Sequence, residues 1–236
     1  MKTVLKFVRN IVIILLITFL VIIGLVVATG YSEYKKVLGD EPLNEKLDSL
    51  RNKSTYVKIQ DLPQAFLDAV VCVEDHRFYE HKGIDIFSIG RAIWTNISQK
   101  SLLQGGSTIS QQVAKNIYLS QKRELSRKVS ESFMAVHLEK NLNKEEILEL
   151  YVNTNYYGEG YYGIGEAARG YYNKEPRDLT LFECTLLAGI PNAPSVYAPT
   201  VNKKLCKERQ NQVIYTMVEN GKLDEATANE LKNQEI

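Results

Sequence analysis

Residues 61–74 read DLPQAFLDAVVCVE and contain the first strong structural signal of the soluble part of this chain. Their apolar residues recur three or four positions apart, which is the period of an amphipathic α-helix. We expect Asp61 to cap the N-terminus of this helix, with Pro63 in its first turn. Glu74 follows Val70 by four residues, so it lies on the apolar face of the same helix.

The helical period continues through most of the remaining chain, and we find no run of alternating strand residues and no internal repeat. Two helices are predicted to begin with a capping box, Thr108 with Gln111 and Asn143 with Glu146. The segment 153–165 is rich in Gly and Tyr and is expected to form a loop. We therefore predict a mainly α-helical fold with one core. Further helices are expected at residues 84–100, 124–140, 163–172 and 179–188, with two more within 202–235.

Glu74 opens a dense polar motif, EDHRFYEHKGID, at residues 74–85. A carboxylate on an apolar helix face has either a structural partner or a catalytic task. The many polar groups that follow at once favour the second reading, because they indicate the wall of a cleft. Glu74 is therefore the first candidate catalytic residue.

A second motif, GGSTISQQVAKN, covers residues 105–116. Its two glycines allow a sharp turn, and Ser107 and Thr108 supply hydroxyl groups at the start of a helix. We expect free backbone N–H groups to face outward there and to form an anion site, with Lys115 and Arg123 adding positive charge. Ordinary helix capping beside a solvated lysine is the alternative. The order of a P-loop is missing, so nucleotide binding is not expected.

A third motif, RKVSESFMA, covers residues 127–135. Arg127 and Glu131 are four residues apart and can form an ion pair on one helix. Glu131 also shares a face with Ala135 and Leu138, so it is a second carboxylate directed inward. A purely structural pair is the alternative.

The N-terminal region contains an uncharged apolar run, IVIILLITFLVIIGLVVA, at residues 11–28. Its length is close to the roughly 20 residues that a membrane-spanning helix needs. Lys2, Lys6 and Arg9 precede it, which places the N-terminus in the cytoplasm. A cleaved signal peptide is the alternative, but the run exceeds the usual apolar core of such peptides. We predict a cytoplasmic N-terminus at 1–10, a transmembrane anchor at 11–30, a polar stalk at 31–60 and the domain at 61–236.

The charge balance excludes one large class of partner. The chain has 29 Lys and Arg against 28 Asp and Glu, a formal net charge of +1, and no nucleic-acid motif, so no nucleic-acid partner is expected. His76, His81 and His137 are its only histidines. They form no HExxH or paired spacing, so no zinc site is predicted and no metal-ligating residue is assigned from the spacing.

Five segments in a fixed order resemble one known family, the peptidoglycan glycosyltransferases. That family comprises monofunctional transglycosylases and the N-terminal modules of bifunctional penicillin-binding proteins. The resemblance implies a lysozyme-like helical glycosyltransferase domain with a membrane-facing small lobe. The matching segments are EDHRFYEHKGID, QGGSTISQQVAKN, RKVSESFMAVHLE, KEEILELYVNTNYYGEGYYGIGEAARGYYNK and LLAGIPNAPSVYAP.

The resemblance also implies roles for individual residues. Glu74 matches the catalytic base of the family, and Glu131 matches a second essential carboxylate. Lys115, Arg123 and Arg91 match the cations with which the family holds the pyrophosphate of the donor. Three further cleft residues of the family match Ser107, Gln112 and Asn116.

The implied reaction is the polymerisation of lipid II into glycan strands. The growing strand, linked to a polyprenyl pyrophosphate, is transferred with inversion to the GlcNAc 4-hydroxyl of lipid II. No cofactor is required, and Glu131 either orients the cations or binds a divalent cation. The implied partners are lipid II, the growing strand, the membrane and cell-wall synthesis proteins. The implied location is the bacterial cell membrane, with the catalytic domain outside the cytoplasm.

Three other functions are weighed against this one. A lysozyme-like hydrolase or lytic transglycosylase would share the fold and a catalytic Glu, but it needs a general acid and has little use for phosphate-binding cations. A non-catalytic cell-wall scaffold would not need both carboxylates and all the cations. Transpeptidase activity is not expected, since Ser32–Lys35 fits S-x-x-K without its companion motifs.

Overall fold

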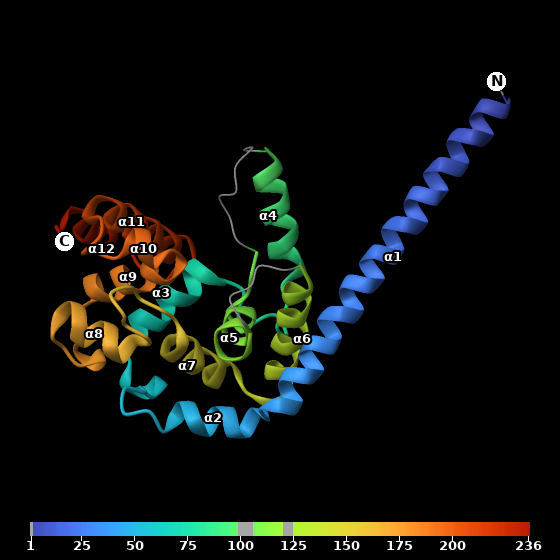
Figure 1. Cartoon of the computed structure of the whole chain (residues 1–236). Coiled ribbons are helices and arrows are strands. Elements are labelled where there is room, and N and C mark those ends of the chain that lie inside the picture. Colours follow the sequence, from blue (N-terminus) through green and yellow to red (C-terminus); the bar gives the residue numbers. More distant parts are fainter. Residues whose placement is uncertain (1, 99–105, 120–124) are drawn as a thin grey trace.

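Helices make up most of the part of the chain that the computed structural model describes, namely residues 2–98, 106–119 and 125–236 (Figure 1). Within these ranges no β-strand occurs, and Tyr156 and Tyr162 form an isolated bridge. The predicted mainly α-helical fold is confirmed. The helices are α1 (Lys2–Asp40), α2 (Leu43–Arg51), α3 (Gln64–Glu74), α4 (Ile86–Ser98), α5 (Ile109–Tyr118), α6 (Leu125–Asn141), α7 (Lys144–Thr154), α8 (Ile164–Tyr172), α9 (Leu181–Gly189), α10 (Pro194–Tyr197), α11 (Lys203–Glu219) and α12 (Glu225–Asn233), with 3₁₀ turns at Ile59–Asp61, Pro176–Asp178 and Ile190–Asn192.

Both predicted capping boxes are present. The Thr108 hydroxyl accepts the N–H of Gln111 at 3.1 Å, and the Gln111 side chain accepts the N–H of Thr108 at 3.0 Å. Asn143 and Glu146 make the same reciprocal pair, at 2.9 and 3.0 Å. These boxes satisfy backbone donors that the first turn of a helix leaves unpaired, which fixes where α5 and α7 begin.

The predicted start of the first helix of the domain is wrong. Asp61 ends a 3₁₀ turn, and α3 begins only at Gln64, with Pro63 at its N-cap and no side-chain cap. The proline ring disfavours helical backbone angles at the residue before it, and Leu62 is extended, with ψ of 143°. Asp61 is therefore separated from the helix that it was expected to cap.

The segment 31–60, which the sequence assigns to a stalk, is helical over much of its length and packs on the domain. Its first part continues α1 without a break to Asp40, and its second part forms α2. Leu43, Leu47 and Leu50 are four and three residues apart and are all buried in the main core. Their spacing gives α2 an apolar face that the domain covers.

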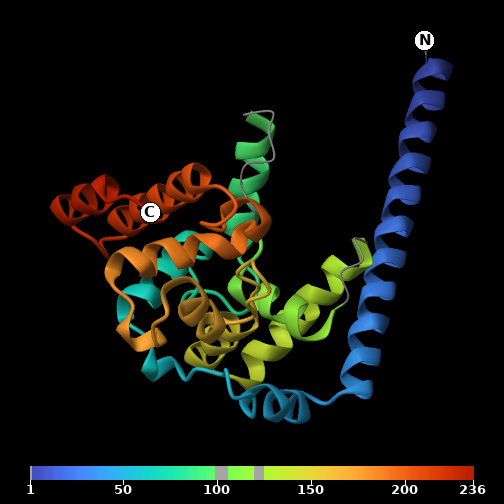
Figure 2. The same cartoon turned by 60° about the vertical axis from the view of Figure 1, so that its left-hand side comes forward.

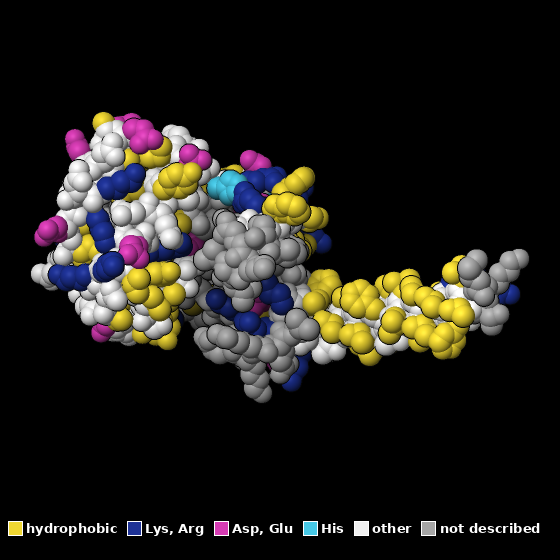
Figure 3. Space-filling model, turned by 90° about the horizontal axis from the view of Figure 1, so that it is seen from above, with side chains coloured by type: hydrophobic (Ala, Val, Ile, Leu, Met, Phe, Trp, Pro, Cys, Tyr) yellow, Lys and Arg dark blue, Asp and Glu magenta, His cyan; other side chains and the backbone are white. Residues whose placement is uncertain are grey.

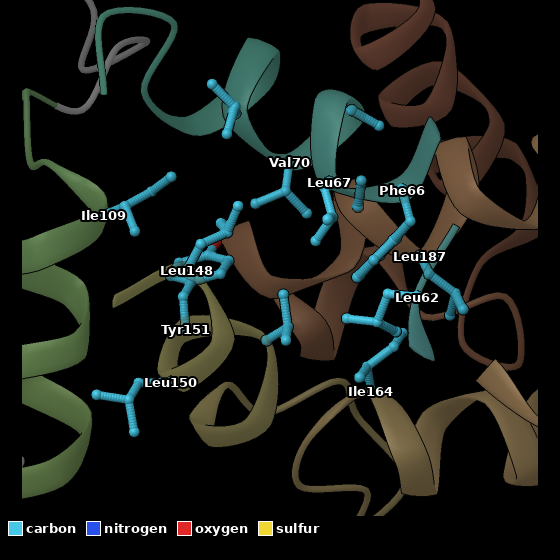
Figure 4. Close-up of a cluster of buried hydrophobic side chains, with 14 of the residues drawn as sticks. Leu62, Phe66, Leu67, Val70, Ile109, Leu148, Leu150, Tyr151, Ile164 and Leu187 are labelled. Atoms are coloured by element: carbon cyan, nitrogen blue, oxygen red, sulfur yellow. The ribbon is translucent and has the colours of Figure 1, made fainter. Parts of the chain in front are cut away.

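The main core is built from residues of many helices (Figure 4). Phe66 and Val70 point inward from α3 and meet Leu148 of α7 and Leu187 of α9. Ile109, the first residue of α5, is fully buried in the same cluster. The end of α3 and the start of α5 are thereby held in one rigid body, and both carry predicted site residues.

The lower part of α1 packs against α6, whereas its upper part extends away from the domain (Figures 1 and 2). Gly30 allows this close approach, because a Cβ at that position would lie 2.6 Å from the carbonyl oxygen of Ser126. The ring of the next residue, Tyr31, lies 5.2 Å from that of Phe133 on α6. The long helix is therefore docked on the domain by a defined interface.

The projecting part of α1 is covered with hydrophobic side chains (Figure 3). The helix is long and apolar enough to cross a membrane. Helix α4 points to the same side of the molecule as the free end of α1 (Figures 1 and 2). It also exposes large apolar side chains, with Ile86, Phe87 and Trp94 each at least 75% exposed.

The packing of α2 leads to a test of stability. We expect Leu47→Ala to lower the free energy of unfolding by about 2–5 kcal/mol, because it leaves a cavity in the core. Asn44→Ala, on the exposed face of the same helix, is the control and should change it by less than about 0.5 kcal/mol. The measurement is urea denaturation in detergent. Equal midpoints for the two variants would mean that α2 is detachable from the domain.

Candidate active site

Glu74 is the last residue of α3, and its side chain is only 7% exposed. Val70 and Val71, one turn earlier, are buried in the main core. The structure thus places this carboxylate on the apolar face of its helix, as the sequence predicted. A charged group in such surroundings needs partners, because burial without them disfavours its charged form.

Two side chains from distant parts of the sequence supply these partners. Gln112 on α5 donates its Nε2–H to Oε2 of Glu74 at 2.8 Å. Arg209 on α11 reaches Oε1 with its Nη2 at 3.2 Å. Each carboxylate oxygen is therefore held by a different helix.

Gln112 is one of the cleft residues that the family resemblance implies, whereas Arg209 was not predicted. A signal was present, because Arg209 follows Cys206 by three residues and precedes Val213 by four. That spacing puts it beside two apolar residues that are both buried. Glu74 was identified from the same pattern, a charged residue at helical spacing from apolar residues. Around Arg209 most neighbouring residues in the sequence are polar, which obscures the pattern.

The second predicted carboxylate, Glu131, lies on α6 with its side chain 2% exposed. The Arg127 Nη1 lies 2.8 Å from Oε1 in an ion pair that lacks the alignment of a hydrogen bond. On the other oxygen, Lys128 donates its Nζ–H to Oε2 at 2.8 Å. The predicted pair of Arg127 with Glu131 is confirmed, and Lys128 adds a second cation.

Lys115 on α5 is within electrostatic reach of both carboxylates. Burial lowers the pKa of Lys115 below the ordinary 10.5, and the positive charges of Lys128 and Arg127 act in the same direction. The negative charges of Glu131 and Glu74 oppose this change. The structure therefore brings three predicted site residues into one charged cluster.

A pocket of about 170 Å³ opens beside this cluster. Lys115 and Arg127 give it positive charge, while Tyr156 and Tyr162 form an aromatic wall with ring centroids 4.9 Å apart. Lys and Arg side chains also gather in the middle of the face seen in Figure 3. A polar pocket of this kind suits an anionic group, because cations in a partly dehydrated site attract it more strongly than in water.

The two remaining predicted cleft residues join the cluster through hydrogen bonds. The Ser107 hydroxyl accepts the Nζ–H of Lys128 at 2.8 Å, which links it to Glu131. Asn116 lines the pocket, and its Nδ2–H donates to Oδ1 of Asn155 at 2.9 Å. Ser107 thus helps to orient Lys128, and Asn116 helps to orient Asn155.

Two predicted cations are not placed in this cluster. Arg91 is exposed on α4, and within the described residues its polar contacts are with His76 at 3.2 Å and with Ser88 at 3.1 Å. Burial and the nearby Arg91 lower the pKa of His76, which favours a neutral ring that accepts this bond. Arg123 lies outside the described residues, as does Gly105 of the second motif.

The predicted free anion site at the start of α5 is wrong. The N–H of Ile109 donates to Oδ2 of Asp75 at 2.9 Å, and the capping box occupies the N–H groups of Thr108 and Gln111. The N-terminus of a helix attracts negative charge, and here a buried carboxylate of the protein itself fills that position.

Asp75 also fixes the turn between α3 and α4. Its carboxylate lies 3.0 Å from Nε2 of His81, whose Nδ1 accepts the N–H of Gly83 at 3.2 Å. This places the ring proton on Nε2, facing Asp75. The Thr108 hydroxyl then donates to the carbonyl of Gly83 at 2.7 Å. The first two motifs are thus tied together directly next to Glu74.

Comparisons with known proteins point to one family. A family profile described as "Transglycosylase" matches residues 41–218, a range that includes α2. A putative transglycosylase of Cupriavidus necator is 43% identical over 182 residues, which cover 77% of this chain and 78% of that protein. Penicillin-binding protein 1A of Neisseria lactamica is 43% identical over 181 residues, which cover 77% of this chain and 23% of that protein.

The chain spans less than a quarter of the length of the Neisseria relatives that it matches, including the one from Neisseria flavescens, with 46% identity over 166 residues. A solved structure of penicillin-binding protein 1A from Haemophilus influenzae matches with a TM-score of 0.47 and 24% identity. That match covers 77% of this chain and 17% of the other.

The Asp75 contacts lead to a test by hydrogen exchange. We expect Asp75→Asn to lower the free energy of unfolding by about 1–3 kcal/mol, because buried donors lose a charged acceptor. The amide of Ile109 should also exchange faster. Asp48→Asn, on the exposed face of α2, is the control and should change neither quantity. An unchanged Ile109 amide in the Asp75 variant would contradict the assignment of this contact.

Proposed function

The chain belongs to the transglycosylase family, and on this premise we propose that it polymerises lipid II into the glycan strands of peptidoglycan. The observation that carries the proposal is the buried carboxylate of Glu74, held beside the charged cluster of Lys115 and Glu131. One group can accept a proton while another balances a phosphate charge. Sugar transfer from a lipid pyrophosphate needs both.

In the proposed reaction, Glu74 is the general base. It takes the proton from the GlcNAc 4-hydroxyl of lipid II while that oxygen attacks the anomeric carbon of the donor MurNAc. The new bond joins the acceptor oxygen to this carbon, and the bond from the carbon to the pyrophosphate breaks. The electron pair leaves with the polyprenyl pyrophosphate, and the anomeric centre inverts. A positioned base typically contributes roughly 10²–10⁴-fold to such a rate.

The leaving pyrophosphate gains negative charge as the bond breaks. Lys115 and Arg127 line the pocket next to Glu131 and can balance that charge. We assign the same task to Arg123 and Arg91 on the strength of the family resemblance. This demand for cations favours synthesis over hydrolysis, in which the leaving group is a sugar hydroxyl that needs an acid.

We assign Glu131 the role of positioning cations. Arg127 and Lys128 each lie 2.8 Å from one of its oxygens. A divalent cation at this carboxylate would face two positive side chains, and like charges at such distances repel strongly in a buried site. We therefore propose that the site works without a metal ion.

Both substrates carry polyprenyl tails, so the reaction has to take place at a membrane. Helix α1 has the length and composition of a membrane span, and the exposed apolar side chains of α4 lie on the side to which it projects (Figures 1 and 2). We propose that the N-terminus is cytoplasmic and that the domain lies outside, facing the bilayer. Tethering raises the effective concentration of enzyme and substrate.

The central test compares wild type with Glu74→Gln on purified lipid II in liposomes. We expect glycan strands from wild type and a loss of about 10²-fold or more in the variant, because an amide cannot accept the proton. Glu80→Gln, 63% exposed, is the control and should polymerise normally. Unfolding midpoints check that each variant is folded. Cleavage of preformed glycan without synthesis would replace our proposal with a hydrolase.

The lowered pKa of Lys115 leads to a test by pH. The rate should fall as the pH rises through this pKa, so the alkaline limb of the rate profile should begin below pH 10.5. Lys115→Arg should move that limb to higher pH, because a guanidinium stays charged. Lys204→Arg on the exposed face of α11 is the control. If the alkaline limb is the same in all three proteins, Lys115 does not balance the charge of the leaving pyrophosphate.

A further inference from the structure

Arg209 is a cation beside the proposed base that the mechanism above does not use. Its side chain is 13% exposed, and its Nη2 lies 3.2 Å from Oε1 of Glu74. The two residues are 135 positions apart in the sequence. Helices α3 and α11 pack against each other, so this pair joins two distant parts of the sequence.

The position of the Arg209 side chain is fixed by three further groups. Its Nε donates to the carbonyl oxygen of Gly189 at 3.3 Å, and its Nη1 donates to Oε1 of Gln212 at 3.1 Å. The guanidinium carbon lies 5.9 Å from the centre of the Tyr197 ring. A Cβ on Gly189 would come within 2.9 Å of Cγ of Arg209, so the glycine leaves room for the stem of this side chain.

The other groups around Glu74 make this cation more important. Tyr151 and Tyr157 are fully buried, and burial first and the charge of Glu74 second raise the pKa of both phenols. The hydroxyl of Tyr157 has no hydrogen-bond partner within the described residues. Among the described residues, the titratable groups that interact with Glu74 include these two phenols, Arg209 and, through its charge, Lys115.

We propose that Arg209 is a positioning residue for Glu74, an inference that rests on the function proposed above. Its guanidinium forms an ion pair with the carboxylate. It also fixes Oε1, while Gln112 fixes Oε2 from the opposite helix. The direction in which the base faces the acceptor hydroxyl is then set before the substrate binds.

Lys207 offers a matched comparison on the same helix. It is also a partly buried cation, and it lies 4.8 Å from the ring of Phe182. Its Nζ donates to the carbonyl oxygens of Leu231 and Gln234, at 2.9 and 2.6 Å, and to Oε1 of Gln210 at 3.0 Å. Its contacts attach the C-terminal segment, so its loss changes packing without changing the charge next to Glu74.

The experiment measures kcat and KM for wild type, Arg209→Met, Arg209→Lys and Lys207→Met. For Arg209→Met we expect kcat to fall about 10- to 100-fold with little change in KM, because the base is misplaced while the pyrophosphate site is intact. Arg209→Lys should restore part of kcat, since it keeps the charge but not the planar fork.

Two outcomes would overturn the inference. One is a fall in kcat for Arg209→Met that is no larger than the fall for Lys207→Met, which would make Arg209 a structural residue only. The other concerns urea unfolding of Glu74→Gln, Arg209→Met and the double variant. We expect Arg209→Met to destabilise the wild type more than it destabilises Glu74→Gln, and equal losses would contradict the pair. The unfolding measurement does not depend on enzymatic activity, so it tests the Arg209–Glu74 pair even if the proposed function is wrong. Failure of the proposed function would instead be seen as a wild-type protein that makes no glycan strands.

Discussion

The buried carboxylate of Asp75 is the contact on which the site depends. It accepts the first N–H of α5 and lies against the ring of His81, so it joins the end of α3 to the start of α5. Glu74 is the residue just before it, and Gln112 lies one turn into α5. Their 2.8 Å hydrogen bond is therefore a direct result of this junction. A negative charge at a helix N-terminus is favourable in its own right, which makes the junction stable.

Each buried carboxylate near the junction has a cation beside it. Glu74 pairs with Arg209 and accepts a hydrogen bond from the neutral Gln112, and Glu131 lies between Arg127 and Lys128. A charge in a partly buried site is costly unless an opposite charge is close to it. This pairing lets the protein keep several ionised groups around one small pocket. It also leaves positive charge at the pocket wall, where a pyrophosphate would bring the missing negative charge.

The long apolar helix α1 packs directly on α6, the helix that carries the second carboxylate. The juxtamembrane part of α1 packs on α6 through Gly30, Tyr31 and Phe133, and α6 carries Glu131. The position of the charged cluster relative to α1 is then set by a helix–helix interface rather than by a loose linker. In the membrane-anchored arrangement that we propose, this interface fixes the height of the cluster above the bilayer.

The sequence by itself determined the features that depend on neighbouring residues. It gave the helical class, both capping boxes and the inward direction of Glu74 and Glu131, because helix period and capping involve residues three or four positions apart. Only the tertiary structure decided that Arg209 meets Glu74, that Asp75 occupies the N-terminus of α5, and that α2 belongs to the core. Those contacts join segments far apart in the chain. Their geometry follows from how the helices pack together, which no local pattern specifies.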